Sequence, residues 1–275
     1  MNVLIVGGSG FLGAELIRQA SAVGHSTAAT FATKPGDASR AGWYHLDLRD
    51  VGRLEAVVDE ADPHLIINAS SGGADWAITA TGPVRLAMIA ARRGIRMVQV
   101  STDAVFSGVA VHYGESALPD PTTPYGAAKA AAETGVLAVH SAAVVARPSL
   151  ILGNGRSEHE RLVHELVDGT VDGALFTDDV RCPVHVADLA AALWELAESD
   201  AAGVRHLAGP DAVSRHELGV LIAERDGLDA ARIPAGLRAE SALPGPVDVR
   251  LDSQATQRQL HTRLRGAREF LRSGP

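Results

Sequence analysis

The feature that most constrains this chain is a glycine run that directly follows its first apolar segment. Residues 3–6 are apolar and have the length of a short buried strand, and four of the next seven residues are glycines. Apolar residues at helical spacing begin at Phe11. A strand, a glycine turn and a helix in this order predict a turn that cradles phosphate groups.

The run fits two related patterns, G-x-G-x-x-G at Gly8, Gly10 and Gly13, and G-x-x-G-x-x-G at Gly7, Gly10 and Gly13. Both patterns need a glycine that accepts a positive φ, a second that lets the backbone approach a pyrophosphate, and a third that lets the helix pack on the strand. The free N–H groups of the helix that begins with Phe11 and Leu12 would face the phosphates. We therefore expect a nicotinamide dinucleotide, with its pyrophosphate at this turn.

The first half of the chain alternates short β-like runs with longer helical patterns, which predicts βαβ units and a parallel sheet. The expected strands are residues 3–6, 26–30, 43–46, 65–67, 96–100 and 143–146, and the expected helices are residues 11–23, 76–93, 125–139 and 185–198. Beyond residue 148 short segments and loops rich in Gly, Asp and Pro take over. The sequence thus predicts an α/β fold, with a Rossmann doubly wound parallel sheet in residues 1–147, to which residues 185–200 return. Residues 148–184 and 201–275 are expected to form a smaller C-terminal α+β substrate domain.

Composition excludes several classes of protein. The formal net charge of −8 argues against a nucleic-acid partner. The single cysteine, Cys182, rules out an internal disulfide and favours a reducing compartment. No apolar run is long enough to span a bilayer and no secretory leader precedes the first strand, so we expect a cytoplasmic protein without a membrane partner. No cluster of His, Cys and carboxylates has metal-ligand spacing, so no metal is expected.

The end of the second expected strand indicates which dinucleotide is bound. An NAD site usually carries an acidic residue about 20 positions after the glycines, where it bonds the ribose 2′-hydroxyl. Here the strand ends in Ala29-Thr30-Phe31-Ala32, and Lys34 follows soon after. A cation and hydroxyl groups suit a 2′-phosphate, which favours NADP(H) over NAD(H). The alternative is that Lys34 is an ordinary solvated loop lysine.

Tyr125 and Lys129 form a Y-x-x-x-K pair at the start of an expected helix. The i, i+4 spacing places both side chains on one helix face. A nearby ammonium favours the phenolate, so we expect Lys129 to lower the pKa of Tyr125 from its ordinary value of about 10. A tyrosine tuned in this way can exchange a proton with a carbonyl or alcohol oxygen. An ordinary surface pair is the alternative interpretation.

Thr102 and Asp103 directly follow the expected strand at residues 96–100. The carboxyl ends of parallel strands line the ligand crevice, so Thr102 is expected to donate a hydrogen bond to a substrate carbonyl. A helix-capping role for Thr102 and a turn-forming role for Asp103 are the alternatives.

The sequence resembles the extended short-chain dehydrogenase/reductase superfamily, and within it most of all the dTDP-4-dehydrorhamnose reductases. The matching segments are residues 7–13, 47–50, 63–69, 101–106, 125–129, 147–149 and 183–190, with weaker support from residues 214–218 and 250–252. The resemblance implies hydride transfer to the C4 keto group of a nucleotide-linked 4-keto-6-deoxysugar. The expected partners are this small-molecule substrate and, as a homodimer, a second copy of the chain.

The resemblance also implies roles for individual residues. Tyr125 would be the proton donor, Lys129 would hold the nicotinamide ribose and tune Tyr125, and Thr102 would assist at the carbonyl. The remaining positions would line the cofactor groove: Asp47, which would bond the adenine, Leu48, Asn68, Ala69 and Ser70.

Several positions depart from the reductase pattern, all on the substrate side. Ala104 stands where the reductases usually carry Tyr, and Leu150 and Ile151 stand where a Trp is usual. Arg156 and Arg181, which offer planar bidentate guanidinium groups, are candidates to meet a diphosphate, and Asp103 is a further substrate-binding candidate.

These departures leave other functions open. One alternative is a reductase of a non-sugar ketone in specialised metabolism. A second is a regulatory subunit that binds NADP without turnover, although Thr102, Tyr125 and Lys129 would then be unnecessary. A third is an epimerase or dehydratase, which Ala104 disfavours because dehydratases of the superfamily usually carry Glu at that position.

Overall fold

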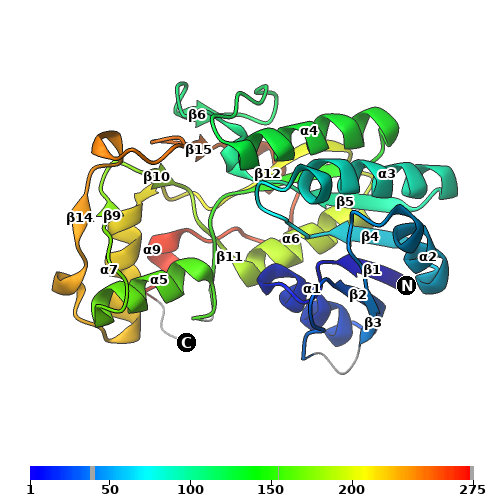
Figure 1. Cartoon of the computed structure of the whole chain (residues 1–275), viewed down its shortest axis with the longest axis horizontal. Helices are drawn as coiled ribbons and strands as arrows, with labels where there is room; N and C mark the ends of the chain where they lie inside the picture. Colours follow the sequence, from blue (N-terminus) through cyan, green and yellow to red (C-terminus); the bar gives the residue numbers. More distant parts are fainter. Residues whose placement is uncertain (38–40, 154, 273–275) are drawn as a thin grey trace.

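The computed structural model describes residues 1–37, 41–153 and 155–272. Its main body is a seven-stranded parallel sheet in the order β12-β7-β5-β4-β1-β2-β3 (Figure 1). The strands are β1 (Asn2–Val6), β2 (Ser26–Phe31), β3 (Ala41–His45), β4 (Leu65–Asn68), β5 (Arg96–Val100), β7 (Val144–Pro148) and β12 (Gly203–Leu207). The strand order reverses between β1 and β4, which confirms the predicted doubly wound α/β fold.

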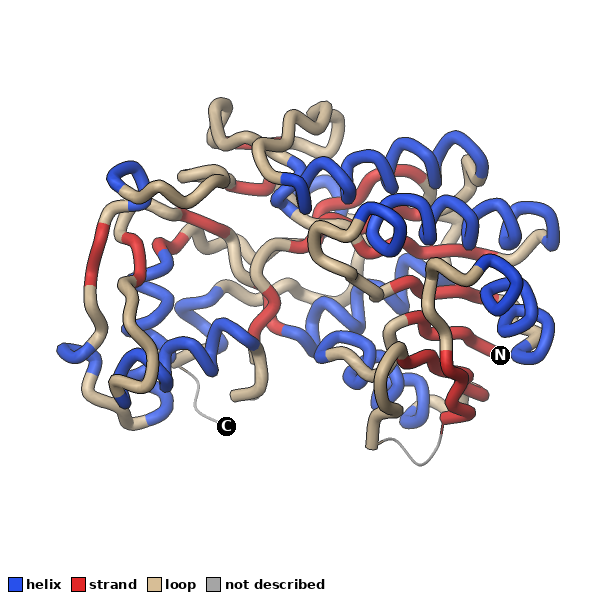
Figure 2. Tube along the Cα trace, in the orientation of Figure 1, coloured by secondary structure: helices blue, strands red, loops and turns tan. Residues whose placement is uncertain are grey.

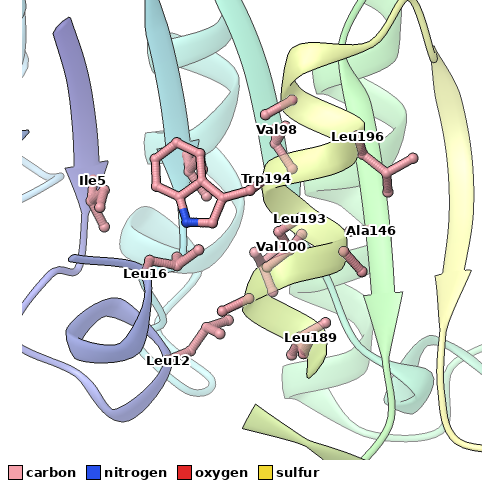
Figure 3. Close-up of a cluster of buried hydrophobic side chains, with 14 of the residues drawn as sticks. Ile5, Leu12, Leu16, Val98, Val100, Ala146, Leu189, Leu193, Trp194 and Leu196 are labelled. Carbon is pink, nitrogen blue, oxygen red and sulfur yellow. The ribbon is translucent and has the colours of Figure 1, made fainter. Parts of the chain in front are cut away.

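Helices cover both faces of this sheet. They are α1 (Phe11–Ala22) and α6 (Val186–Glu198) on one face, and α2 (Val51–Ala61), α3 (Gly82–Arg93) and α4 (Pro124–Val139) on the other. A parallel sheet is buried on both faces, so its strands are almost continuously apolar. In β1, Val3 and Ile5 enter the core under α1 and α6, while Leu4 and Val6 enter the core under the other three helices. Figure 3 shows the first of these cores, with side chains of α1 and α6 gathered against the strands.

A smaller region lies beside the carboxyl ends of the central strands, and Figure 2 shows how much of it is loop. Its helices are α5 (Glu158–Asp168), α7 (Arg215–Asp226), α8 (Gln254–Gln257) and α9 (Ala267–Phe270). Short strands form four pairs: β8 (Ile151–Leu152) with β11 (Val184–His185), β9 (Leu175–Phe176) with β14 (Ala235–Gly236), β10 (Val180–Arg181) with β13 (Val213–Ser214), and β6 (His112–Tyr113) with β15 (Arg250–Leu251). Three 3-10 turns lie in connections among the described residues: η2 (Asp103–Val105) between β5 and β6, η3 (Ala230–Arg232) between α7 and β14, and η4 (Arg238–Glu240) between β14 and β15. An apolar cluster between α5 and α7 gives this region its own core.

The structure differs from the sequence-based expectations in several places. Residues 203–207, which we assigned to the smaller domain, form β12 and extend the main sheet by pairing with β7. The long helix expected from residue 76 begins with a π-helical turn, η1 (Ala77–Thr81), before α3. Strand β7 continues to Pro148, past the end that we expected at residue 146. Helix α2 was not predicted, because its apolar stripe of Leu54, Val57 and Val58 is short.

Within residues 1–37, 41–153 and 155–272, no helix has both the length and the apolar character that a membrane crossing requires.

Candidate active site

The predicted functional residues meet at the carboxyl edge of the sheet, where the strand order reverses. The glycine turn follows β1, and Thr102 follows β5. Asn68 is the last residue of β4, and Ser70 lies just beyond it. Parallel strands present their carboxyl ends at one edge, so residues far apart in sequence come together there.

The glycine turn has the shape of a phosphate cradle. Gly7 has a φ of +81°, and a Cβ added to it would lie 2.8 Å from the Ser70 Cα. A Cβ added to Gly13 would overlap the Gly7 carbonyl oxygen, so α1 packs directly on the turn. Gly10 caps α1 without a side chain and the first turn of α1 carries no acidic residue, which leaves its N–H groups available to an anion. These features fit the pyrophosphate of a dinucleotide.

The two residues that begin α1 contribute differently. Leu12 is a buried core residue and Phe11 packs partly against the same core. The Leu12 side chain therefore supports the core, and the backbone groups of both residues at the helix N-terminus are placed to meet a ligand.

Thr30 has a different partner from the one that we expected. Its side chain is buried at 2% exposure, and its Oγ1 accepts a hydrogen bond of 3.0 Å from the Gly7 N–H. Thr30 therefore braces the glycine turn from the neighbouring strand. Lys34 is exposed in the loop after β2. That loop passes the turn, because a Cβ on Gly36 would lie 3.6 Å from the Ser9 Cα.

The segment after β4 is wedged between the glycine turn and α4. Asn68 is fully buried and donates to Gln99 Oε1 at 2.8 Å, while its Oδ1 accepts from the Ser70 hydroxyl at 2.6 Å. The Ser70 carbonyl accepts from the Lys129 ammonium at 3.5 Å, and the Ala69 N–H donates to the Val6 carbonyl at 2.9 Å. This segment thus joins the cofactor turn to Lys129.

Asp47 and Leu48 lie on the loop that precedes α2. Asp47 is half-buried and hydrogen bonded by the Arg49 guanidinium, which lowers the pKa of Asp47 to about 2. Asp47 is therefore an ionised acceptor at neutral pH. Leu48 is buried against Gly82 at the start of α3, so its side chain supports the loop from below.

Tyr125 and Lys129 begin α4, and the helix is well defined there. The Thr123 hydroxyl caps it by accepting from the Gly126 N–H at 3.0 Å, and Pro124 occupies its first turn. The Lys129 ammonium lies 6.0 Å from the centre of the Tyr125 ring. Lys129 is buried and donates to the Val100 carbonyl at 3.2 Å. The i, i+4 pair is therefore built as the sequence predicts.

The expected lowering of the Tyr125 pKa by Lys129 is not what the structure gives. Burial raises the pKa of Tyr125, and the hydrogen bonds from the hydroxyls of Thr102 and Ser71 only partly oppose that rise. Burial also lowers the pKa of Lys129, to about 8. Desolvation is the largest effect on the pKa of each group. Tyr125 is consequently a neutral phenol at neutral pH, which is the form that donates a proton.

Asp103 and Arg181, both predicted to meet the substrate, lie in one buried cluster. Asp103 accepts from the Ser149 hydroxyl at 2.6 Å and lies 3.7 Å from the Arg181 Nε. Arg181 pairs with Asp179 at 2.8 Å and donates to the Pro246 carbonyl at 2.8 Å. Its guanidinium is thus already engaged by the protein. Arg156, by contrast, is exposed on the loop before α5.

A cavity of about 480 Å³ opens between α5, β9 and α7 on the far side of Arg181. Its walls are mostly apolar, and its polar end is formed by His159, Asp179, Arg215 and Arg238. The guanidinium groups of Arg215 and Arg238 each approach Asp179 to 3.6 Å. Arg215 and Arg238 thus share the Asp179 carboxylate with Arg181, which also lies near Asp103. The cavity wall itself carries these two guanidinium groups and one carboxylate, so its polar end has excess positive charge.

Sequence reasoning missed several of these residues. Ser71 and Ser101 follow predicted strands, and Ser101 also lies in the matched segment at residues 101–106, but nothing in their spacing singled them out. Arg215 lies in the matched segment at residues 214–218, and that was the only signal for it. Burial lowers the pKa of His159 to about 4, with Arg215 contributing, so its imidazole is neutral in the cavity wall. Among the described residues, no three His, Cys, Asp or Glu side chains are grouped to hold a metal ion.

The chain is similar to proteins of known family and structure. The family model described as the RmlD substrate binding domain matches residues 1–273. The dTDP-4-dehydrorhamnose reductase of Mycobacterium tuberculosis is 30% identical over 266 residues, which cover 89% of this chain and 82% of that protein.

Two solved structures share the fold. The dTDP-4-dehydrorhamnose reductase of Bacillus anthracis, in complex with NADP, has a TM-score of 0.83 and 22% identity, covering 98% of this chain and 96% of that one. MoeE5, in complex with UDP-glucuronic acid and NAD, has a TM-score of 0.85 and 24% identity, covering 100% of this chain and 97% of that one.

Proposed function

The chain belongs to the RmlD substrate binding domain family, and from this premise we propose that it reduces the C4 keto group of a nucleotide-linked 4-keto-6-deoxysugar with NADPH, using Tyr125 as the proton donor. Membership of the family makes it an NAD(P)-dependent oxidoreductase of the extended short-chain type. The observation that carries the proposal is geometric: the Tyr125 phenol is hydrogen bonded to Thr102 and lies beside Lys129, at the sheet edge that also holds the glycine turn.

The proposed division of labour follows from the positions of the side chains. The chemistry that a bound nicotinamide supplies is hydride transfer. Tyr125 Oη gives its proton to the carbonyl oxygen as charge develops there, and the Thr102 hydroxyl donates a second hydrogen bond to the same oxygen. Lys129 would hold the nicotinamide ribose, and its cationic form would stabilise the phenolate that remains. The glycine turn and the N-terminus of α1 would hold the pyrophosphate.

The charge around the glycine turn favours NADP over NAD. No acidic residue stands between the end of β2 at Phe31 and Lys34, and the loop that carries Lys34 passes Ser9 of the turn. The wild-type protein is expected to bind NADPH at least about tenfold more tightly than NADH. Lys34→Ala should remove most of that difference, while Lys34→Arg should keep it. Titration of nicotinamide fluorescence measures both affinities, and equal affinities in the wild type would contradict the preference.

A nucleotide-linked substrate is supported by the cavity beside Arg181. Arg181 contacts both Asp103, the residue after Thr102, and Asp179, which lies in the cavity wall. A single side chain, that of Arg181, therefore separates the loop that carries Thr102 from the cavity. Excess positive charge at the polar end of the cavity suits a diphosphate, because guanidinium groups bind phosphate oxygens bidentately.

Arg215→Met tests this placement of the nucleotide. Asp179 keeps Arg181 and Arg238 as partners in the variant, so the fold should hold. We expect the KM for a sugar nucleotide to rise about tenfold or more with kcat changed much less, since the lost contact lies away from the reacting carbonyl. Arg232→Met removes an exposed arginine of η3 as the matched control. A KM that matches the wild type would place the nucleotide elsewhere.

Turnover with a panel of substrates tests the function as a whole. NADPH oxidation is followed with nucleotide-linked 4-keto-6-deoxysugars and with simple ketones. Turnover restricted to the sugar nucleotides supports the proposal. Turnover restricted to the simple ketones would replace it with a non-sugar reductase, and tight NADPH binding without any turnover would replace it with a regulatory subunit.

A further inference from the structure

A buried ionic cluster lies directly beneath the catalytic pair and has no part in the mechanism described so far. Glu133 follows Lys129 by one turn of α4, and its carboxylate accepts two bonds from Arg147 of β7, at 2.9 Å and 2.6 Å. The same carboxylate accepts from the Ser101 hydroxyl at 2.5 Å. Ser101, Lys129, Glu133 and Arg147 are each at most 4% exposed. Burial of a carboxylate costs several kcal/mol unless it is paired, so this geometry is strongly fixed.

Glu133 connects α4, which carries Tyr125 and Lys129, with the ends of β5 and β7. Ser101 immediately precedes Thr102, so its bond to Glu133 fixes the loop that presents the threonine hydroxyl. Arg147 immediately precedes Pro148 and Ser149, and the Ser149 hydroxyl binds Asp103 in the same loop. One carboxylate of α4 thus ties Tyr125 and Lys129 to the strand ends on which Thr102 and Asp103 lie.

Glu133 is also the acidic group that acts on the Lys129 ammonium. That ammonium donates only to neutral carbonyl oxygens, those of Val100 and Ser70, among the bonds that the described residues provide. Burial lowers the pKa of Lys129 to about 8, and the charge of Glu133 opposes this effect. The other ionisable groups around the pair are Tyr125 on the same helix, Asp103 beside Tyr125, and Arg147 with its neighbour His206.

We propose that Glu133 is a positioning residue, which keeps Lys129 cationic in its buried site and holds the Thr102 loop against Tyr125. This inference rests on the proposed function for its catalytic consequence. Its electrostatic part concerns cofactor binding alone and is testable without turnover.

The direction of the effect follows from the charge of Lys129. A lysine is cationic below its pKa, and removal of a nearby carboxylate lowers that pKa further. The cationic form would therefore be lost at lower pH in Glu133→Gln. If cationic Lys129 holds the cofactor ribose, NADPH affinity should weaken at lower pH in the variant than in the wild type.

The experiment compares NADPH binding across pH in the wild type and Glu133→Gln, measured by nicotinamide fluorescence. We expect the alkaline loss of affinity to move down by about one pH unit, which corresponds to one removed partly screened charge. Where turnover is available, the alkaline limb of kcat should move in the same direction. Glu133→Asp, which keeps the charge, should restore most of the wild-type profile.

Glu133→Gln leaves the Arg147 guanidinium buried without a charged partner, which can prevent folding. The double variant Glu133→Met, Arg147→Met removes both charges, and it should fold with little loss in Tm. Its alkaline loss of affinity should move down by less than in Glu133→Gln, because the Arg147 charge that disfavours cationic Lys129 is removed as well. Glu160→Gln is the matched control, because Glu160 is a fully buried carboxylate that pairs with Arg225 at 2.7 Å in the smaller region. It should lower the Tm without moving the pH profile.

Two outcomes are distinguishable. A wild-type pH profile in Glu133→Gln, or in the double variant should Glu133→Gln fail to fold, would overturn the inference while the proposed function stands. Failure of the wild-type protein to bind NADPH at any pH would overturn the proposed function itself.

Discussion

Replacement of Tyr125 by Phe is expected to lower kcat by about 10²–10⁴-fold, which is the usual contribution of a positioned general acid. The phenyl ring keeps the packing of the phenol, so the fold and the start of α4 should be unaffected. The dissociation constant of NADPH should change by no more than about twofold, because the glycine turn, Lys34 and Lys129 remain. The reason for the large effect is that the Tyr125 phenol is the group that holds a transferable proton beside Thr102.

Tyr44→Phe serves as the matched control, because Tyr44 is a half-buried tyrosine of β3 that packs against the core under α2, α3 and α4. That variant should retain wild-type turnover. Stopped-flow measurement of nicotinamide oxidation with a sugar nucleotide identified from the panel separates binding from chemistry. A Tyr125→Phe enzyme with undiminished kcat would remove Tyr125 from the mechanism.

Gly126→Ala is expected to lower kcat by about 100-fold and to destabilise the protein by about 1–3 kcal/mol. Helix propensity alone predicts the opposite, since alanine is favoured over glycine by about 1 kcal/mol inside a helix. The packing decides against propensity here. A Cβ at Gly126 would overlap the carbonyl oxygen of Ala104 and would lie 3.0 Å from the Pro121 Cβ. The Ala104 backbone cannot move aside as a flexible side chain can, so α4 must move away from η2.

That displacement would separate Tyr125 from Thr102, which lies two residues before Ala104. The loss of kcat should therefore be larger than the loss of stability alone would cause. Gly52→Ala is the control, because a Cβ there meets nothing closer than 3.7 Å. It should leave activity unchanged and raise stability by about 0.5–1 kcal/mol. Thermal unfolding and turnover measured on both variants check the prediction. A stable, fully active Gly126→Ala protein would show that the approach of α4 to η2 is not needed.

Tyr125 shows how much of the site can be predicted from local sequence spacing. The Y-x-x-x-K spacing places Tyr125 and Lys129 on one face of α4, and the structure confirms that placement. The electrostatic consequence that we drew from the spacing was wrong, because it treated the two groups as if they were exposed. In the structure both are desolvated, and burial dominates the pKa of each.

The sequence by itself determined the parts of this protein that depend on local spacing. The glycine run, the alternation of strands and helices and the i, i+4 pair are short patterns whose geometry is set by backbone sterics and helical or strand periodicity. They predicted the parallel doubly wound sheet, the phosphate-binding turn and the tyrosine and lysine of the site.

Only the tertiary structure decided which partners the polar side chains find. Thr30 braces the Gly7 N–H across 23 residues, Arg147 pairs with Glu133 across 14, and Arg181 is held by the Pro246 carbonyl across 65. Such pairings arise where the chain folds back on itself, and each buried polar group must take the partner that the fold brings to it. No periodicity in the sequence encodes that choice, which is why the glycine turn was predicted and the residues that brace it were not.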